Sequence, residues 1–105
     1  MPFAEVAVNS EGAGRRTFSY SIPTHLSLQP GQAVWVPFGA QVLQGVVMAL
    51  AERPQVDATR EILKTIGQHP LILPERLELA HWISTYYMCP LFDALLSFLP
   101  PAFER

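Results

Sequence analysis

The sequence predicts an α+β domain in which a small twisted antiparallel β-sheet, or open barrel, is followed by two C-terminal helices. Three observations support this prediction. Apolar and polar residues alternate over short segments in the first two thirds of the chain, glycine and proline separate these segments, and the apolar spacing becomes helical after residue 73. The chain has 105 residues, the size of a single domain, so we expect residues 1–105 to form one unit.

The expected strands follow one another in the first part of the chain. Residues 3–8 alternate in a way that predicts a strand with one buried face. Residues 17–22 alternate similarly, and Pro23 ends that strand because it has no N–H to donate. Further strands are expected at residues 33–38, 42–50 and 61–66, with a polar surface loop over residues 51–61.

Two glycines in this region have an expected structural role. The segment Gln29-Pro30-Gly31-Gln32 predicts a type II turn, because proline presets φ at the second position and glycine accepts a positive φ at the third. Gly45 lies inside the strand expected at residues 42–50, which indicates either a bulge or a close approach between two backbones.

Two helices are expected after the strands. Apolar residues recur at helical spacing within residues 74–87, and Pro74 suits the first turn of a helix. Cys89-Pro90 should end this helix, and a second helix is expected over residues 90–99. The expected apolar face of the first helix comprises Leu77, Ala80, Ile83 and Tyr87.

Composition limits the classes of function. Half of the residues are hydrophobic and 15% are charged, so one apolar face is expected to be buried against another part of a larger assembly. The formal net charge is −2, whereas a protein that contacts many phosphates is normally basic. A nucleic-acid-binding role would therefore depend on a local site. We see no signal peptide or membrane span, and we expect a soluble, intracellular protein.

The sequence predicts no catalytic or metal centre. It has neither of the glycine-rich phosphate-binding motifs, and His25, His69 and His81 share no metal-ligand spacing. The single cysteine, Cys89, excludes an internal disulfide and a multi-cysteine zinc site within this chain, and we expect it to pack in the core. We therefore expect that this chain is not itself an enzyme.

Binding is better supported than catalysis. Arg15 and Arg16 follow a glycine-rich loop and precede a strand that carries Phe18 and Tyr20. Arginine can pair with a phosphate through two hydrogen bonds, and aromatic rings can stack on an exposed base. Gly39, in the corner Val-Pro-Phe-Gly, permits a ligand to approach the backbone closely. The alternative is that the aromatic residues are core and the arginines are solvated.

Three motifs, in this order and spacing, resemble a known family over nearly the whole chain. They are R-T-F-x-Y, P-G-x-x-V-x-V-P-F-G, and a helix that ends in Y-Y-x-x-P-L. The combination resembles the N-terminal 3′-DNA-binding domain of the bacterial replication-restart helicase PriA (primosomal protein N′). The resemblance implies that the domain recognises the 3′-terminal nucleotide of the nascent leading strand at a stalled replication fork.

The resemblance also implies which residues bind DNA. This family typically has aspartate where this chain has Ser19, and serine, unlike a carboxylate, can donate as well as accept a hydrogen bond. We therefore expect weaker discrimination against a 3′-phosphate or an internal nucleotide. The basic residue before the next strand corresponds best to Arg60, with Lys64 close by. The full set of expected DNA-binding residues is Arg16, Phe18, Ser19, Tyr20, Gly39, Arg60 and Lys64.

For the intact protein, the resemblance implies an ATP-dependent 3′-to-5′ DNA helicase that binds ATP, magnesium and zinc outside this chain, which itself holds no cofactor. The implied partners are DNA, the remaining helicase domains, other primosome proteins and single-strand-binding protein, with no membrane. The implied location is the cytoplasm of a bacterium, in association with the nucleoid. The alternative is a protein-interaction module that docks on the helicase and recognises DNA ends little.

Overall fold

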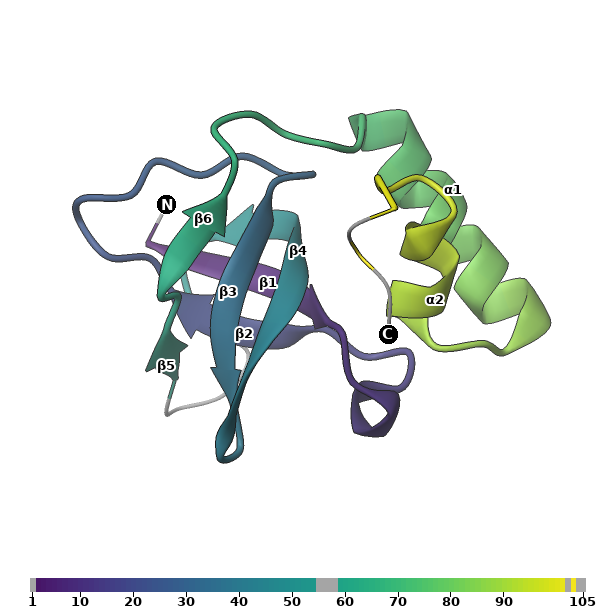
Figure 1. Ribbon diagram of the computed structural model, residues 1–105, viewed down its shortest axis with the longest axis horizontal. Helices are drawn as coiled ribbons and strands as arrows, with labels where there is room; N and C mark the ends of the chain where they lie inside the picture. Colours follow the sequence, from purple (N-terminus) through teal and green to yellow (C-terminus); the bar gives the residue numbers. More distant parts are fainter. Residues whose placement is uncertain (1, 55–58, 102, 104–105) are drawn as a thin grey trace.

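The computed structural model describes residues 2–54, 59–101 and 103, in which a curled six-stranded sheet lies beside two helices (Figure 1). This arrangement confirms the α+β class and the two C-terminal helices. The elements are β1 (Phe3–Val8), the short 3₁₀ helix η1 (Glu11–Ala13), β2 (Phe18–Ser21), β3 (Ala33–Phe38), β4 (Gln41–Ala51), β5 (Arg60–Glu61), β6 (Lys64–Ile66), α1 (Pro74–Tyr87) and α2 (Leu91–Leu96).

The strand order in the sheet is β5-β2-β1-β4-β3-β6. Four of the five pairings are antiparallel, as expected: β2 with β1, β1 with β4, β4 with β3, and β3 with β6. The fifth, between β5 and β2, is parallel, so the sheet is mixed. The polar loop expected over residues 51–61 is shorter at both ends, because Ala51 belongs to β4 and β5 begins at Arg60. Its residues 55–58 lie outside the described part of the chain.

Residues 61–66 do not form the single strand that the sequence predicts. The backbone N–H of Ile62 donates to Ser21 at 3.0 Å, at one edge of the sheet, and that of Leu63 donates to Trp35 at 2.9 Å, near the other edge. The chain therefore crosses between the two edges of the sheet within two residues, with the Ile62 side chain buried in the core. We call residues 60–66 the edge bridge; it curls the sheet toward a closed barrel.

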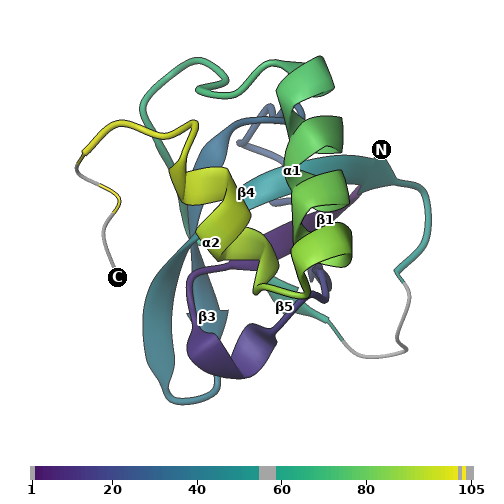
Figure 2. The same cartoon turned by 90° about the vertical axis from the view of Figure 1, so that its right-hand side faces the viewer.

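The prediction of one buried face on β1 is wrong, because both faces are buried. Ala4, Val6 and Val8 face the inside of the curled sheet, where they pack with side chains from β2, β3 and β4. Ala7 faces the opposite way and packs in a second core with residues of α1 and α2, and Glu5 is also buried. β1 lies at the centre of the sheet, between β2 and β4, and the helices cover its outer face (Figure 2).

The two glycines with predicted roles lie at close contacts. A Cβ atom on Gly45 would lie 2.6 Å from a side-chain carbon of Val6, which confirms a close approach between β4 and β1; the register shift between these strands lies elsewhere, opposite Glu5 and Val6. Gly31 has φ +93°, as a type II turn requires. A Cβ atom there would lie 2.0 Å from the carbonyl oxygen of Ile72.

The two helices pack against each other and against the sheet through their buried sides. α1 buries Leu77, Ala80 and Ser84, but Tyr87 is exposed, in contrast to the expected apolar face. α2 is shorter than the predicted 90–99 because the chain turns at Ser97 into the proline pair that follows, where backbone N–H donors are missing. Neither described helix has the length and apolar character needed to cross a membrane.

Candidate functional site

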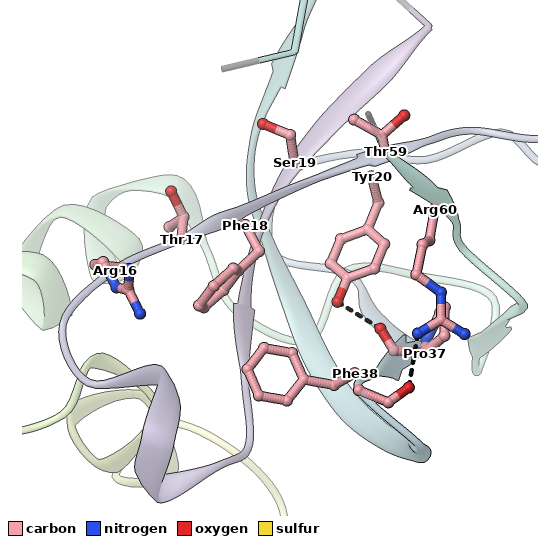
Figure 3. Close-up of a pocket in the computed structure, with 10 residues that line it drawn as sticks. Arg16, Thr17, Phe18, Ser19, Tyr20, Pro37, Phe38, Thr59 and Arg60 are labelled. Atoms are coloured by element: carbon pink, nitrogen blue, oxygen red, sulfur yellow. Dashed lines mark hydrogen bonds between the residues drawn. The ribbon is translucent and has the colours of Figure 1, made fainter. Parts of the chain in front are cut away.

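An open cavity of about 430 Å³ lies at one end of the curled sheet, where β2, the turn between β3 and β4, and the start of β5 meet (Figure 3). It brings together all but one of the residues that the sequence analysis selected. Its lining comprises Arg16, Thr17, Phe18, Ser19, Tyr20, Pro37, Phe38, Gly39, Thr59 and Arg60.

Two phenylalanine rings form an aromatic wall in this cavity. The rings of Phe18 and Phe38 meet edge to face, with their centroids 5.0 Å apart and an interplanar angle of 80°. Both side chains are half-buried, and the guanidinium of Arg16 lies 5.2 Å from the centre of the Phe18 ring. Phe38 was not selected from the sequence. The wall gives the cavity an apolar surface with a cation at its border, a combination suited to a flat, negatively charged ligand.

Tyr20 contributes to the core more than to an exposed binding surface. Its side chain is 4% exposed, and its hydroxyl donates a 2.7 Å hydrogen bond to the carbonyl oxygen of Pro37 (Figure 3). Burial raises the pKa of Tyr20 above its ordinary value of 10.0, and the charge of Arg60 opposes this rise. The bond ties β2 to the end of β3, so Tyr20 fixes the position of the corner that follows Pro37.

That corner holds a basic side chain in place. Gly39 has φ +60°, a conformation that other residues rarely adopt, and a Cβ atom there would meet no atom within 4 Å. The carbonyl oxygen of Gly39 accepts a 2.8 Å hydrogen bond from Nη1 of Arg60 (Figure 3). A guanidinium carries five N–H donors, so one contact can orient the group while other donors serve a ligand.

The side chain of Ser19 points away from the two phenylalanine rings (Figure 3). Its hydroxyl donates a 2.6 Å hydrogen bond to Oε2 of Glu5, on the neighbouring strand β1. Thr17, on the same side of the strand, donates to Oε1 of Glu5 at 3.4 Å. Glu5 was not predicted from the sequence, although an acidic residue inside an otherwise apolar strand is an unusual feature that could have indicated it.

Lys64 lies apart from the other selected residues. It begins β6 and pairs with Trp35 of β3, and it is not among the residues that line the cavity. Arg60 and Lys64 are separated because the edge bridge crosses the sheet between them. Among residues 2–54, 59–101 and 103, no three side chains of His, Cys, Asp or Glu lie close enough together to hold a metal ion.

Comparison with known proteins places these features in a family. Residues 5–100 match a family model described as the 3′ DNA-binding domain of PriA. The chain is 36% identical over 87 residues to the replication restart protein PriA of Haemophilus influenzae, a match that covers 81% of this chain and 12% of that protein. The PriA of Synechocystis is 33% identical over 106 residues, covering 95% of this chain and 12% of the relative.

A third relative comes from another bacterium. The replication restart protein PriA of Bacillus subtilis is 32% identical over 109 residues, which covers 99% of this chain and 14% of that protein. The chain thus spans about one eighth of the length of these curated relatives. The residues matched by the family model include all those that line the cavity.

Proposed function

Because this chain belongs to the family of PriA 3′ DNA-binding domains, we propose that it binds the 3′-terminal nucleotide of a DNA strand in the cavity between β2 and the β3–β4 turn. The observation that carries this proposal is the convergence of four features in one cavity. An aromatic wall, two arginines, a glycine corner and an edge of the sheet all border the same space.

The size of the cavity supports one nucleotide as the ligand. Its volume of about 430 Å³ falls at the lower end of the ~300–1,000 Å³ typical of small-molecule sites. A base can lie against Phe18 or Phe38, since every base has a π-face and stacking contributes about 1–3 kcal/mol per base. The exposed backbone at Gly39 permits the sugar to approach closely.

The charge distribution supports a small number of phosphate contacts. The chain has a net charge of −2, but Arg16 and Arg60 both lie at the cavity. A guanidinium can pair with one phosphate through two hydrogen bonds. Affinity for a single strand should therefore depend weakly on salt, with a slope of about 0.7 for each phosphate that is neutralised. Tethering to a DNA-binding motor would raise the effective concentration of the ligand.

In this proposal the chain is the DNA-end-recognition part of a larger replication restart protein. That protein would act at stalled forks as an ATP-dependent 3′-to-5′ helicase, and its ATP, magnesium and zinc would bind outside this chain. The remaining helicase domains, primosome proteins and single-strand-binding protein would be its protein partners, in the cytoplasm at the nucleoid. The chain itself would orient the motor on DNA and catalyse no reaction.

A second candidate function is docking on other parts of the helicase, with little recognition of DNA ends. It is favoured by the outer surface of α1, where Trp82 and Tyr86 are stacked with their ring centroids 4.9 Å apart and are 54% and 65% exposed. Exposed aromatic residues that lie together are typical of protein interfaces. This surface does not overlap with the cavity lining, so the two functions can be tested separately.

The test compares three single strands of equal length and sequence, using fluorescence anisotropy with the 105-residue chain. One strand is linear with a free 3′-OH, one carries a bulky 3′ block, and one is circular and has no end. End recognition predicts that only the first strand binds well. Equal binding to all three strands, or binding to none, would contradict the proposal and favour the docking function.

A further inference from the structure

In the part of the chain that the structure describes, the arginines and aromatic rings suited to a nucleic acid lie together in the cavity. Arg16 and Arg60 line it beside the aromatic wall of Phe18 and Phe38. The other described arginines and lysines lie outside the lining; they are Arg15, Arg53, Lys64 and Arg76. A net charge of −2 is also unlike that of proteins that hold a long strand by its phosphates. Recognition by this chain is therefore concentrated on a single nucleotide.

The cavity offers a separate group to each part of a nucleotide. The edge-to-face rings of Phe18 and Phe38 form an apolar wall for the base, and the open backbone at Gly39 leaves room for the sugar. The guanidinium of Arg60 can pair with a phosphate. These groups line the same space, and Figure 3 shows Arg60 and both rings around it. One nucleotide can therefore contact all of them at once.

Contacts within the chain hold these groups in place. Nη1 of Arg60 donates at 2.8 Å to the carbonyl oxygen of Gly39, and the hydroxyl of Tyr20 ties Pro37 to β2. The two phenylalanine rings support each other, with their centroids 5.0 Å apart. A site that is already formed loses little conformational entropy on binding, so a small ligand can bind without the additional contacts of a long strand.

A free nucleoside 5′-monophosphate carries the same parts as the last nucleotide of a strand. It has a base, a sugar with a free 3′-hydroxyl, and a phosphate on the 5′ carbon. A phosphate monoester carries a charge of about −1.5 to −2 at pH 7, more than the diester of a strand, and this favours pairing with a guanidinium. The preceding nucleotides of a strand are therefore not required for the contacts that the cavity makes.

We infer that the cavity is also a binding site for free nucleoside 5′-monophosphates, which compete with DNA ends for the same groups. The inference rests on the proposed function, and it adds a second class of ligand and a means of regulation. Occupancy by a strand end would fall as the concentration of free nucleotide rises. One stacked base and one charged pair predict a dissociation constant of roughly 1 mM. A tethered motor would offset the competition by holding a strand end near the cavity.

The test is displacement of a linear 3′-OH strand, labelled at its 5′ end, from the 105-residue chain by dAMP, followed by fluorescence anisotropy. An inhibition constant of roughly 1 mM is expected. Deoxyadenosine lacks the phosphate and should compete roughly tenfold more weakly. Inorganic phosphate lacks the base and, at matched ionic strength, should also displace the strand roughly tenfold more weakly.

An NMR titration of the amide signals with dAMP locates the site. In the wild type, the signals of Phe38 and Gly39 should shift. Arg60→Met should raise the dissociation constant of dAMP roughly tenfold and make it similar to that of deoxyadenosine, because the phosphate loses its partner. Lys64→Met, outside the cavity, is the matched control and should leave the constant unchanged.

Each other outcome has a defined meaning. If the linear 3′-OH strand binds better than circular DNA but dAMP displaces it no better than inorganic phosphate, the inference is overturned and the proposed function is retained. Shifts confined to residues outside the cavity, or equal losses in the two variants, also overturn the inference. If Arg60→Met does not fold, equal competition by dAMP and deoxyadenosine in the wild type overturns it instead.

The two proposals can also fail in the opposite order. A chain that binds dAMP in the cavity and has no preference for 3′-OH ends keeps the nucleotide site and loses the proposed function. A chain that does neither loses both.

Discussion

Replacing Tyr20 by phenylalanine tests whether one buried hydroxyl holds the cavity corner in place. The hydroxyl donates a 2.7 Å bond to the carbonyl oxygen of Pro37, and both residues are buried. Tyr20→Phe keeps the ring and leaves this carbonyl without its donor, which should lower the free energy of unfolding by about 1.5 kcal/mol. In a domain of 105 residues, this corresponds to a fall of roughly 6–8 °C in Tm.

The pH dependence gives the same variant a second measurement. Burial raises the pKa of Tyr20 in the folded state above 10.0, so the neutral phenol is favoured by folding. The stabilisation is therefore complete below pH 10 and is lost as the pH rises from 10 through the folded-state pKa. Tyr20→Phe has no phenol to ionise, so only the wild type loses stability as the pH rises. The difference in stability between wild type and variant should therefore shrink above pH 10.

The assay is thermal unfolding followed by circular dichroism, from pH 7 to pH 11, with Tyr87→Phe as the control. Tyr87 loses the same atom, but it is 66% exposed and should leave Tm unchanged. DNA-end affinity, measured well below Tm, should also fall for Tyr20→Phe, because Phe38 and Gly39 follow the anchored Pro37 directly. If the Tm of Tyr20→Phe lies within about 1 °C of wild type, the hydroxyl does not anchor the corner.

Three further predictions concern the cavity and the fold. Arg60→Met should weaken binding of a 3′-OH strand roughly 10- to 100-fold and reduce the slope of affinity against salt concentration by about 0.7. Lys64→Met, outside the cavity, should change the affinity less than about twofold. Equal losses in the two variants would contradict the cavity as the binding site. Phe38→Ala should cost about 1–3 kcal/mol of binding free energy in the same titration, and a folded variant with wild-type affinity would exclude stacking on this ring. Gly31→Ala should lower the free energy of unfolding, measured in urea, by about 2–5 kcal/mol, because the alanine would have a strained φ and its new Cβ atom would lie 2.0 Å from the carbonyl oxygen of Ile72. Gly67→Ala, with φ +78° and no atom within 4 Å of the new Cβ, should lose only the backbone strain of about 1–2 kcal/mol. Similar losses in the two variants would refute the clash at Gly31.

Local patterns in the sequence were sufficient to predict the type of each main element. Alternation located β1 and β2, and the turn and corner residues around them located β3 and β4, in each case to within one residue at either end. The same patterns could not predict that β1 is buried on both faces. That depends on its central place in the sheet and on two helices that lie more than 60 residues further along the chain.

The division of residues 61–66 into β5 and β6 also could not be predicted from the sequence. The six residues EILKTI have the composition of one strand. Which edge each half joins is decided by pairing with Ser21 and Trp35, and these partners are distant in the sequence. For the same reason, proximity in sequence grouped Lys64 with Arg60, although only Arg60 lines the cavity.

The candidate site was predicted in part by motifs and in part missed. The arginine–aromatic strand and the glycine corner indicated a common binding region, and the structure brings Phe18 and Gly39 into one lining. Phe38 and Glu5 were missed because their relevance arises from contacts across the sheet. The ring of Phe38 meets that of Phe18, and the carboxylate of Glu5 meets Ser19. The local sequence shows neither partner, although the acidic residue within an apolar strand marks Glu5 itself as unusual.

The edge bridge has a consequence for how the domain opens. The amides of Ile62 and Leu63 are adjacent in the chain, yet each hydrogen bond holds a different margin of the sheet. Local unfolding of this short segment would release both margins together and would displace Arg60 from Gly39 in the same event. Amide hydrogen exchange at the two positions should therefore be synchronous, and a bound strand end that engages Arg60 should slow both.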